Sequence, residues 1–298
     1  MNNLFNIETY NPIRDDNMKI KVIPTDLAPL NEKLGGGLMT GEFYIFQAPT
    51  GGGKSTLILR MFLKCITSGE KAAYISMGEQ TSVELFEKLI CMYEGIPYLS
   101  YKLGENDYRE KKLNIFTKTL EEKINNINIY YTNKPYTPDY DNPNMNDFTR
   151  IISDIKKKEI SFIFIDYIGA DCSSHNEKVS KYELLKLYCD QLEHLAADYN
   201  KCIVGAIQMN RNFSFYLRSN DFDPFYVNGE FTADSIGAMQ KATVGISFFK
   251  HKDRKDEVET QYFNVFKNRA IGDLGPIKTK ISKNYFKWSE INEKEIDF

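Results

Sequence analysis

The stretch Ala48-Pro49-Thr50-Gly51-Gly52-Gly53-Lys54-Ser55 decides how this chain of 298 residues is expected to fold. It matches the phosphate-binding pattern of a small residue, four variable positions and Gly-Lys-Ser/Thr, which requires a strand before it and a helix after it. The apolar run 42–48 predicts a buried strand, and residues 54–68 carry apolar side chains at helical spacing. Because the context is the required one, a glycine-rich turn that matches by chance is the disfavoured interpretation.

The chemistry of this loop, the P-loop, points to a nucleoside triphosphate. Its glycines let backbone N–H groups curl around phosphate oxygens, and the helix that follows aims its positive end at the same anion. Lys54 is expected to reach the β and γ phosphates, and Ser55 to bind Mg²⁺. The sequence therefore predicts ATP and Mg²⁺ as cofactors, and the predicted nucleotide-binding residues are Ala48, Pro49, Thr50, Gly51, Gly52, Gly53, Lys54, Ser55 and Thr56.

A carboxylate, Asp166, lies near the end of the almost entirely apolar run 160–167. Burying an acid is costly unless it has a partner, and in P-loop ATPases that partner is the hydrated Mg²⁺ ion. Asp166 is therefore predicted to complete the metal site beside Ser55. The plainer alternative is an ordinary aspartate that caps the next loop.

Two more polar residues follow predicted strands and are candidates for catalysis. Glu79 comes three positions after Ser76, where it would polarise the attacking water, although a surface glutamate that starts the next helix is the alternative. Gln208 ends the strand predicted at 202–207. A neutral amide there would touch the γ-phosphate and report its presence to the following loop, and a simple polar strand end is the alternative.

The triplet Lys267-Asn268-Arg269 ends a predicted strand at 260–267. Because side chains alternate along a strand, Lys267 and Arg269 project from the same face. Two cations on one side suit a phosphate that a neighbouring subunit supplies, which is the arginine-finger arrangement. A solvated basic turn is the alternative.

The alternation of strands and helices predicts an α/β fold, a mostly parallel central sheet flanked by helices, with antiparallel strands at the C-terminal end. Residues 1–22 are expected to be a tail or linker and 23–298 a single ATPase domain. Residues 98–125 are expected to be mostly helical and 133–144 a loop. The predicted strands are 42–48, 72–76, 127–131, 160–167, 202–207, 241–249, 260–267, 277–282 and 284–288, and the predicted helices are 54–68, 83–92, 147–158 and 181–199.

The net charge of −3 argues against a general nucleic-acid binder, which is usually basic, but allows basic groups concentrated on one surface. The cysteines form no CxxC pair, and we expect all five to be buried free thiols. There is no apolar run of membrane-spanning length and no signal peptide. We therefore expect a cytoplasmic protein without membrane contact, in the host cytoplasm if the gene is phage-encoded.

These motifs, in this order, resemble the C-terminal ATPase domain of the DnaB-type replicative helicases within the RecA-like superfamily, over about residues 22–288. The resemblance implies a phage-like member of the family that lacks the family's N-terminal domain, since about 22 residues precede the core. The family usually places its glutamate two residues after the strand serine, whereas Glu79 is three after Ser76. Besides the P-loop, the matching stretches are 23–27, 34–42, Asp166-Tyr167, Gln208 to Arg211, Asp234-Ser235-Ile236 and Lys267 to Arg269.

The resemblance implies a RecA-like P-loop ATPase that hydrolyses ATP, moves along single-stranded DNA and unwinds duplex during replication. It implies a homo-oligomer, a hexameric ring, with Lys267 and Arg269 acting on the nucleotide of the next subunit, and primase or other replisome proteins as further partners. The loops 170–180 and 212–231 would face DNA, with Arg211 and Arg218 pairing with phosphates. Three aromatic side chains would either stack on bases or pack the second loop, namely Phe213, Phe215 and Tyr216.

Two other functions stay open on the sequence alone. One is a recombinase or KaiC-like regulatory ATPase on the same core, which would form filaments and pair strands. The other is a helicase-loading scaffold that binds nucleotide as a structural switch, which would bind ATP tightly without turnover.

Overall fold

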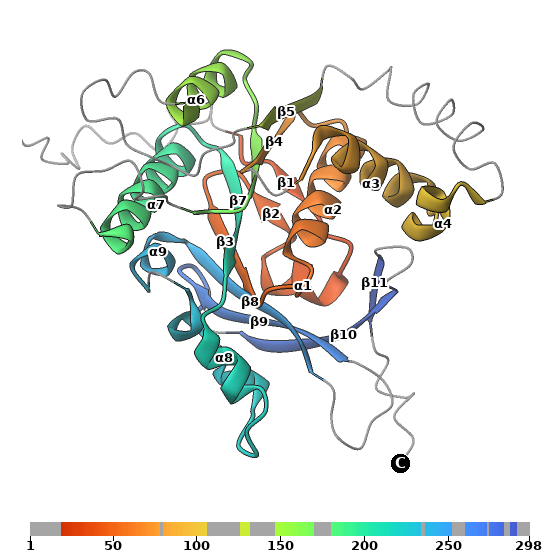
Figure 1. Cartoon of the computed structure of the whole chain (residues 1–298). Coiled ribbons are helices and arrows are strands. Elements are labelled where there is room, and N and C mark those ends of the chain that lie inside the picture. The colour runs from red at the N-terminus through yellow and green to blue at the C-terminus, as the bar shows by residue number, and fades with distance from the viewer. Residues whose placement is uncertain are drawn as a thin grey trace, which may run out of the picture.

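The computed structural model describes residues 19–77, 80–105, 126–131, 147–169, 180–233, 236–251, 260–272, 274–282 and 287–290. Within these residues the main sheet has nine strands in the order β11-β10-β9-β8-β3-β7-β6-β4-β5. Helices cover both faces of the sheet, so the fold is a three-layer α/β arrangement (Figure 1).

The centre of the sheet is parallel, as predicted. β3 (Phe43–Ala48) lies between β7 (Cys202–Gln208) and β8 (Val244–His251), and β6 (Phe162–Asp166), β4 (Ala72–Ser76) and β5 (Ile127–Tyr131) continue the sheet. Every residue of β3, β4 and β6 is buried, because both faces of these strands are covered. Their sequences are therefore mostly apolar and lack the alternation of polar and apolar residues that marks a half-buried strand, and the apolar runs were enough to identify them as strands.

Three antiparallel strands extend the sheet beyond β8. They are β9 (Thr260–Asn268), β10 (Gly275–Ser282) and β11 (Lys287–Glu290), which confirms the antiparallel C-terminal end. The strand predicted at 241–249 begins only at Val244, because Lys241 is the last residue of the short helix α9 (Ile236–Lys241). The prediction missed α9 because it has only six residues.

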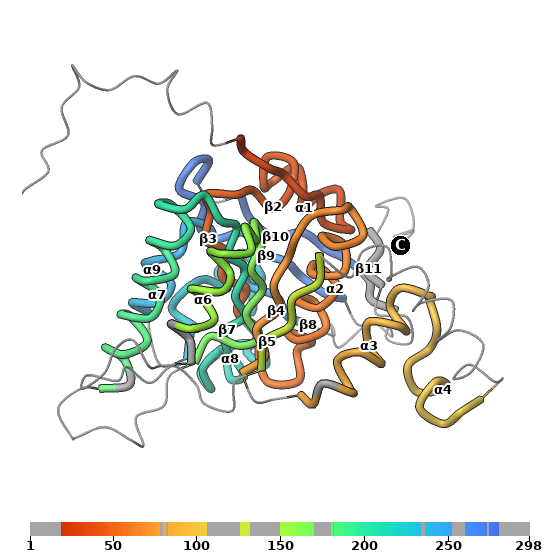
Figure 2. Tube along the Cα trace, turned by 90° about the horizontal axis from the view of Figure 1, so that it is seen from above, coloured from red at the N-terminus to blue at the C-terminus, as the bar shows by residue number. Residues whose placement is uncertain are grey.

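Two apolar cores sandwich the sheet. On one face Tyr44 and Phe46 of β3 pack in a cluster with α2 (Lys54–Thr67), α3 (Ser82–Glu94) and α1 (Ala28–Lys33). On the other face Phe43 and Ile45 pack with α6 (Asp147–Lys157), α7 (Lys181–Asp198) and α9. The view from above separates these two helical layers (Figure 2).

The described part of the long region 98–125 begins with α4 (Tyr98–Leu103), while residues 106–125 and the predicted loop 133–144 lie outside the described residues. Residues 1–18 also lie outside them, so the domain division stays a prediction. Val22 already belongs to β1 (Val22–Ile23), which pairs with β2 (Leu38–Met39). Of the cysteines, four are buried and unpaired as predicted, and Cys172 falls outside the described residues. Among the described helices none is long and apolar enough to span a membrane.

Candidate nucleotide-binding site

The P-loop connects the carboxyl end of β3 to α2, as the sequence predicted. Two glycines take left-handed conformations, with φ of 72° at Gly51 and 93° at Gly53, which other residues adopt only with strain. Gly53 is also the N-cap of α2, so the free N–H groups of the first helical turn open onto the loop. The ammonium group of Lys54 folds over the loop, 3.2 Å from the carbonyl oxygen of Pro49. This turn at a helix N-terminus suits a phosphate chain.

Asp166 lies beside the P-loop at the carboxyl end of β6. Its side chain is only 1% exposed, and the hydroxyl of Ser55 donates a hydrogen bond to Oδ1 at 3.2 Å. Tyr74 donates to Oδ2 at 2.8 Å, and Gln80 donates to the same oxygen at 3.3 Å. Burial raises the pKa of the Asp166 carboxyl, while the hydrogen bonds from Tyr74 and Ser55 oppose that shift.

The hydroxyl oxygen of Ser55 and the carboxylate oxygen of Asp166 fit Mg²⁺ better than a metal that is held entirely by protein ligands. Among the described residues there is no group of three or more His, Cys, Asp or Glu side chains that could hold a metal ion. Mg²⁺ usually keeps several waters and takes one or two protein oxygens together with substrate phosphates. The Ser55 hydroxyl and the Asp166 carboxylate offer that number, next to the phosphate-binding loop.

The structure adds two polar partners that the sequence did not identify. Tyr74 is fully buried in β4, and its hydroxyl has Asp166 as partner, which a buried tyrosine requires. Gln80 also receives a hydrogen bond from Lys88 of α3 at 3.2 Å, so it links that helix to the metal site. Glu79, the predicted general base, lies outside the described residues and stays a prediction.

Gln208 reaches the P-loop directly. β7 pairs with β3 so that Gln208 stands opposite Ala48, and its Nε2 donates to the Thr50 hydroxyl at 2.6 Å. The side chain remains exposed at the end of the strand. The structure therefore brings together Lys54, Ser55, Asp166 and Gln208 at adjoining strand ends.

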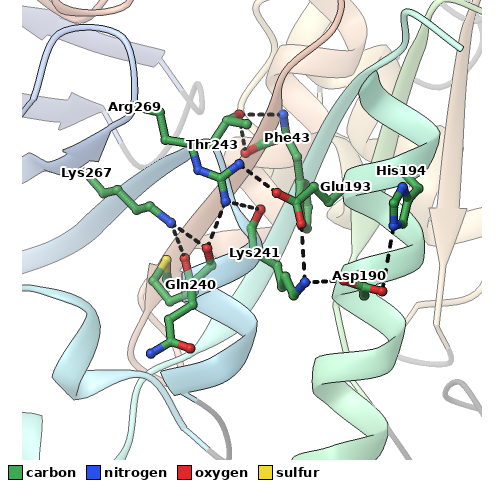
Figure 3. Close-up of polar contacts among 10 residues, drawn as sticks. Phe43, Asp190, Glu193, His194, Gln240, Lys241, Thr243, Lys267 and Arg269 are labelled. Atoms are coloured by element: carbon green, nitrogen blue, oxygen red, sulfur yellow. Dashed lines mark hydrogen bonds and ion pairs between the residues drawn. The ribbon is translucent and has the colours of Figure 1, made fainter. Parts of the chain in front are cut away.

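Lys267 and Arg269 lie near Thr243 and Phe43 (Figure 3), at the end of β3 that is opposite the P-loop. The backbone N–H of Arg269 donates to the carbonyl of Thr243, whose own N–H donates to the carbonyl of Phe43, the first residue of β3. The P-loop follows Ala48, the last residue of that strand, so about 17 Å of extended chain separates the two ends. The two cations are therefore not part of the nucleotide site of their own chain.

Both cations converge on the C-terminus of α9, in agreement with the predicted alternation. Lys267 donates to the carbonyls of Met239 and Gln240 at 2.9 and 2.8 Å. Arg269 donates to the Gln240 carbonyl at 3.1 Å and pairs with Glu193 of α7 at 2.6 Å (Figure 3). Burial and the neighbouring Arg269 lower the pKa of Lys267 to about 8, against the opposing effect of Glu193.

Comparison with known proteins gives the family. The sequence profile described as "DnaB-like helicase C terminal domain" matches residues 22–290. This chain belongs to that family. None of the curated protein sequences compared with this DnaB-like chain matches it.

Solved structures agree with the fold of the DnaB-like domain. A solved ATPase domain superposes with a TM-score of 0.71 at 16% identity, covering 94% of this chain and 95% of that one. "The Structure Of A DnaB-Like Replicative Helicase And Its Interactions With Primase" gives 0.70 and 16%, covering 94% of this chain and 64% of that one. The RecA-like fold predicted from the motifs is confirmed, and the chain spans less than two thirds of the second relative.

The segment after Gln208 differs from the loop predicted at 212–231. It forms α8 (Arg211–Tyr216) and two 3-10 turns, η5 (Pro224–Tyr226) and η6 (Gly229–Phe231). Phe213 is fully buried, with its ring centroid 5.6 Å from that of Phe231 and 5.4 Å from that of Phe249. Aromatic packing holds the segment in a compact shape that a polar loop would not have.

Of the aromatic residues predicted either to stack on bases or to pack the loop, Phe213 and Tyr216 do the packing. Tyr216 stacks on Phe231 at 5.3 Å, whereas Phe215 is 75% exposed and free to meet a ligand. Arg211 and Arg218 are both exposed on this segment. The other predicted DNA-facing loop, 170–180, lies outside the described residues except for Ser180, which is the N-cap of α7.

A pocket of about 370 Å³ opens between the ends of β6 and β7 and the start of α8. Its lining includes Tyr167 and Gly169, which follow β6, and Gln208, Asn210 and Arg211 at the end of β7 and the start of α8. The pocket therefore places the candidate γ-phosphate sensor and a candidate DNA-binding arginine on one surface.

Proposed function

We propose that this DnaB-like domain is an ATP-driven motor that moves along single-stranded DNA and unwinds duplex during replication. The observation that carries the proposal is the contact between Ser55 and Asp166, 3.2 Å apart beside Lys54 and the helix N-terminus. This is the arrangement that phosphoryl transfer to water requires, because catalysis depends almost entirely on positioning and charge stabilisation.

Each residue of the site has a separate task in that reaction. The backbone N–H groups of the P-loop and Lys54 bind the phosphates, while Ser55 and Asp166 hold Mg²⁺. Bound Mg²⁺ would neutralise charge on the β and γ phosphates. Gln208, which touches Thr50 of the P-loop, detects the γ-phosphate, and Glu79 is our candidate for orienting the attacking water.

The position of Arg269 supports an assembly in which the next subunit completes the site. Arg269 and Lys267 lie at the amino end of β3, so in their own chain they face away from the P-loop. The exposed guanidinium of Arg269 suits the phosphate of a neighbouring chain, and the half-buried ammonium of Lys267 lies beside it. We therefore propose a ring of identical subunits, with six as the expected number, and primase as a candidate partner.

DNA contact is proposed for the surface formed by α8 and the turns after it. Arg211 and Arg218 would neutralise phosphates, and Phe215 would stack on a base. The two arginines stand on the same segment as the exposed Asp221, Asp223 and Glu230, so the proposed contact is with individual phosphates and does not need a basic surface, in keeping with the net charge of −3.

The test compares ATP hydrolysis with and without single-stranded DNA, for the wild-type protein and Lys54→Ala. We expect DNA to stimulate the wild type and Lys54→Ala to hydrolyse no ATP under either condition. Equal slow rates with and without DNA would refute the motor and favour a regulatory ATPase. Tight ATP binding without turnover would favour the nucleotide-switched scaffold.

A further inference from the structure

Gln47 is a buried amide in the strand that carries the P-loop. Side chains alternate along β3, so Gln47 points to the same face as Phe43 and Ile45, which belong to the apolar core around α7. Gln47 is 0% exposed. An amide at such a position is unfavourable unless all its polar atoms find partners.

The partners of Gln47 all come from outside β3. Its Nε2 donates to the carbonyl of Asn228 at 2.6 Å and to the hydroxyl of Ser247 at 2.7 Å. Its Oε1 accepts a hydrogen bond from the Thr232 hydroxyl at 2.7 Å. Two of these partners, Asn228 and Thr232, belong to the segment 209–232 that contains α8, which we call the arm (Figure 1).

Gln47 is one of three buried polar side chains that form a row across neighbouring strands. Gln47 stands opposite Ser247 of β8, and Ser247 stands opposite Asn264 of β9, and all are 0% exposed. Ser247 donates to the carbonyl of Val227 at 2.7 Å, and Asn264 donates to the carbonyls of Phe225 and Val227 at 3.0 and 3.1 Å. The three side chains of the row therefore bind backbone carbonyls of residues 225–228. These residues belong to the part of the arm that leads back to the sheet, which we call the returning limb.

The first residues of the arm, which we call the outgoing limb, attach to β3, the same strand that carries the P-loop. The N–H of Met209 donates to the carbonyl of Ala48 at 2.9 Å, next to the contact of Gln208 with Thr50. The two limbs are joined at their base, where Asn210 N–H donates to the Phe231 carbonyl at 2.7 Å. Residues 47, 48 and 50 thus hold both limbs.

We infer that Gln47 is a positioning residue that ties the arm to the P-loop strand, so that occupation of the P-loop by phosphate reaches the DNA-facing arm through both limbs. The inference rests on the proposed function, which it deepens by naming how nucleotide and DNA are coupled. The amide of Gln47 has two partners for its nitrogen and one for its oxygen in a closely packed core, so it has few alternative arrangements and a shift of β3 moves its partners with it. Gln208 contacts the P-loop just before the start of the arm, and Gln47 adds a direct contact between the P-loop strand and the end of the arm.

The test uses threonine hydroxyls as matched pairs. Thr232 is 4% exposed and donates to Gln47, whereas Thr279 of β10 is 0% exposed and donates to the carbonyl of Gln261 at 3.2 Å. Thr232→Val and Thr279→Val therefore each remove one buried hydroxyl at nearly constant volume. Thr232→Ser keeps the hydroxyl, and Ser247→Ala removes a different partner of Gln47 should Thr232→Val fail to fold.

We expect all variants to keep the kcat and KM for ATP hydrolysis without DNA within about 2-fold of the wild type. Stimulation by single-stranded DNA should fall about 5-fold or more in Thr232→Val and in Ser247→Ala, a typical size for the coupling of two sites. Thr232→Ser and Thr279→Val should be stimulated like the wild type. Equal stimulation of Thr232→Val and Thr279→Val would overturn the inference.

Amide hydrogen exchange separates this inference from the proposed function. With a non-hydrolysable ATP analogue, amides at 225–232 should exchange more slowly in the wild type and in Thr279→Val, but not in Thr232→Val. If that pattern appears while DNA does not stimulate hydrolysis, the inference that Gln47 ties the arm to the P-loop strand is supported, and the proposed function as a DNA motor is refuted. If the analogue leaves exchange in the arm unchanged in the wild type, the inference is overturned whatever the effect of DNA.

Discussion

The hydroxyl of Ser55 donates a hydrogen bond to the carboxylate of Asp166 at 3.2 Å, although 111 positions separate the two residues in the chain. Two different strands, β3 and β6, end at the same edge of the sheet and bring the pair together. Every chemical role proposed for the site starts from this contact, because it defines where Mg²⁺ and the phosphates must lie.

The first prediction concerns the charge of Asp166. Asp166→Asn should shift the Mg²⁺ concentration needed for hydrolysis upward by about 10–100-fold, as changes around metal sites usually do. The nucleotide-free variant should be at least as stable as the wild type in urea, because the buried charge, whose pKa is raised by burial, is gone. The half-exposed Asp154, paired with Lys158 at 2.8 Å, gives the control Asp154→Asn, and equal Mg²⁺ titrations of both variants would contradict the assignment.

The second prediction concerns action between subunits. Arg269→Ala and Lys54→Ala should each abolish hydrolysis, since an arginine finger contributes about 10³–10⁵-fold to kcat. Mixing the two proteins should restore activity, because some interfaces combine an intact Lys54 with an intact Arg269. Mixing Lys54→Ala with the double variant Lys54→Ala/Arg269→Ala creates no such interface and is the control. Failure of the first mixture at every ratio would show that Arg269 does not act on a neighbour.

The third prediction follows from the pKa of Lys267, which burial lowers to about 8. The unfolded chain keeps the proton up to about pH 10.4, so between these values the unfolded state binds more protons than the folded state. The free energy of unfolding of the wild type should therefore rise with pH relative to Lys267→Met, by at most about 1.4 kcal/mol per pH unit. Urea unfolding of nucleotide-free protein from pH 7 to 10 measures this, and parallel curves for the two proteins would refute the shift.

The fourth prediction separates two phenylalanines of α8. Phe213→Ala should cost about 3–5 kcal/mol of stability, because the ring is fully buried. Phe215→Ala should change stability by less than about 0.5 kcal/mol, since its side chain is 75% exposed. It should weaken binding of single-stranded DNA by about 1–3 kcal/mol if the ring stacks on a base. Thermal unfolding and a DNA titration of Phe215→Ala test both roles, and unchanged DNA affinity would exclude stacking.

The sheet could be predicted largely from the sequence because its central strands are buried on both faces. The runs at 72–76 and 127–131 match β4 and β5 residue for residue, and the polar strand ends Asp166 and Gln208 marked two candidate site residues. Each of these signals lies within a few neighbouring residues, so the sequence pattern alone is enough to predict these strands and their polar ends.

The rest depends on contacts between distant parts of the chain. α8 has six residues with one buried side chain, Phe213, and therefore lacks a helical pattern. The row Gln47, Ser247 and Asn264 exists only through the register of β3, β8 and β9, and Arg269 meets Glu193 only in the folded chain. No spacing in the sequence indicates such partners.

Strand displacement on a forked DNA duplex tests the central claim most directly. Wild-type protein should release the labelled strand only when it hydrolyses ATP, and neither a non-hydrolysable analogue nor Lys54→Ala should support release. Wild-type protein that hydrolyses ATP in the presence of the fork, yet leaves the duplex intact at every protein concentration, would contradict a helicase motor.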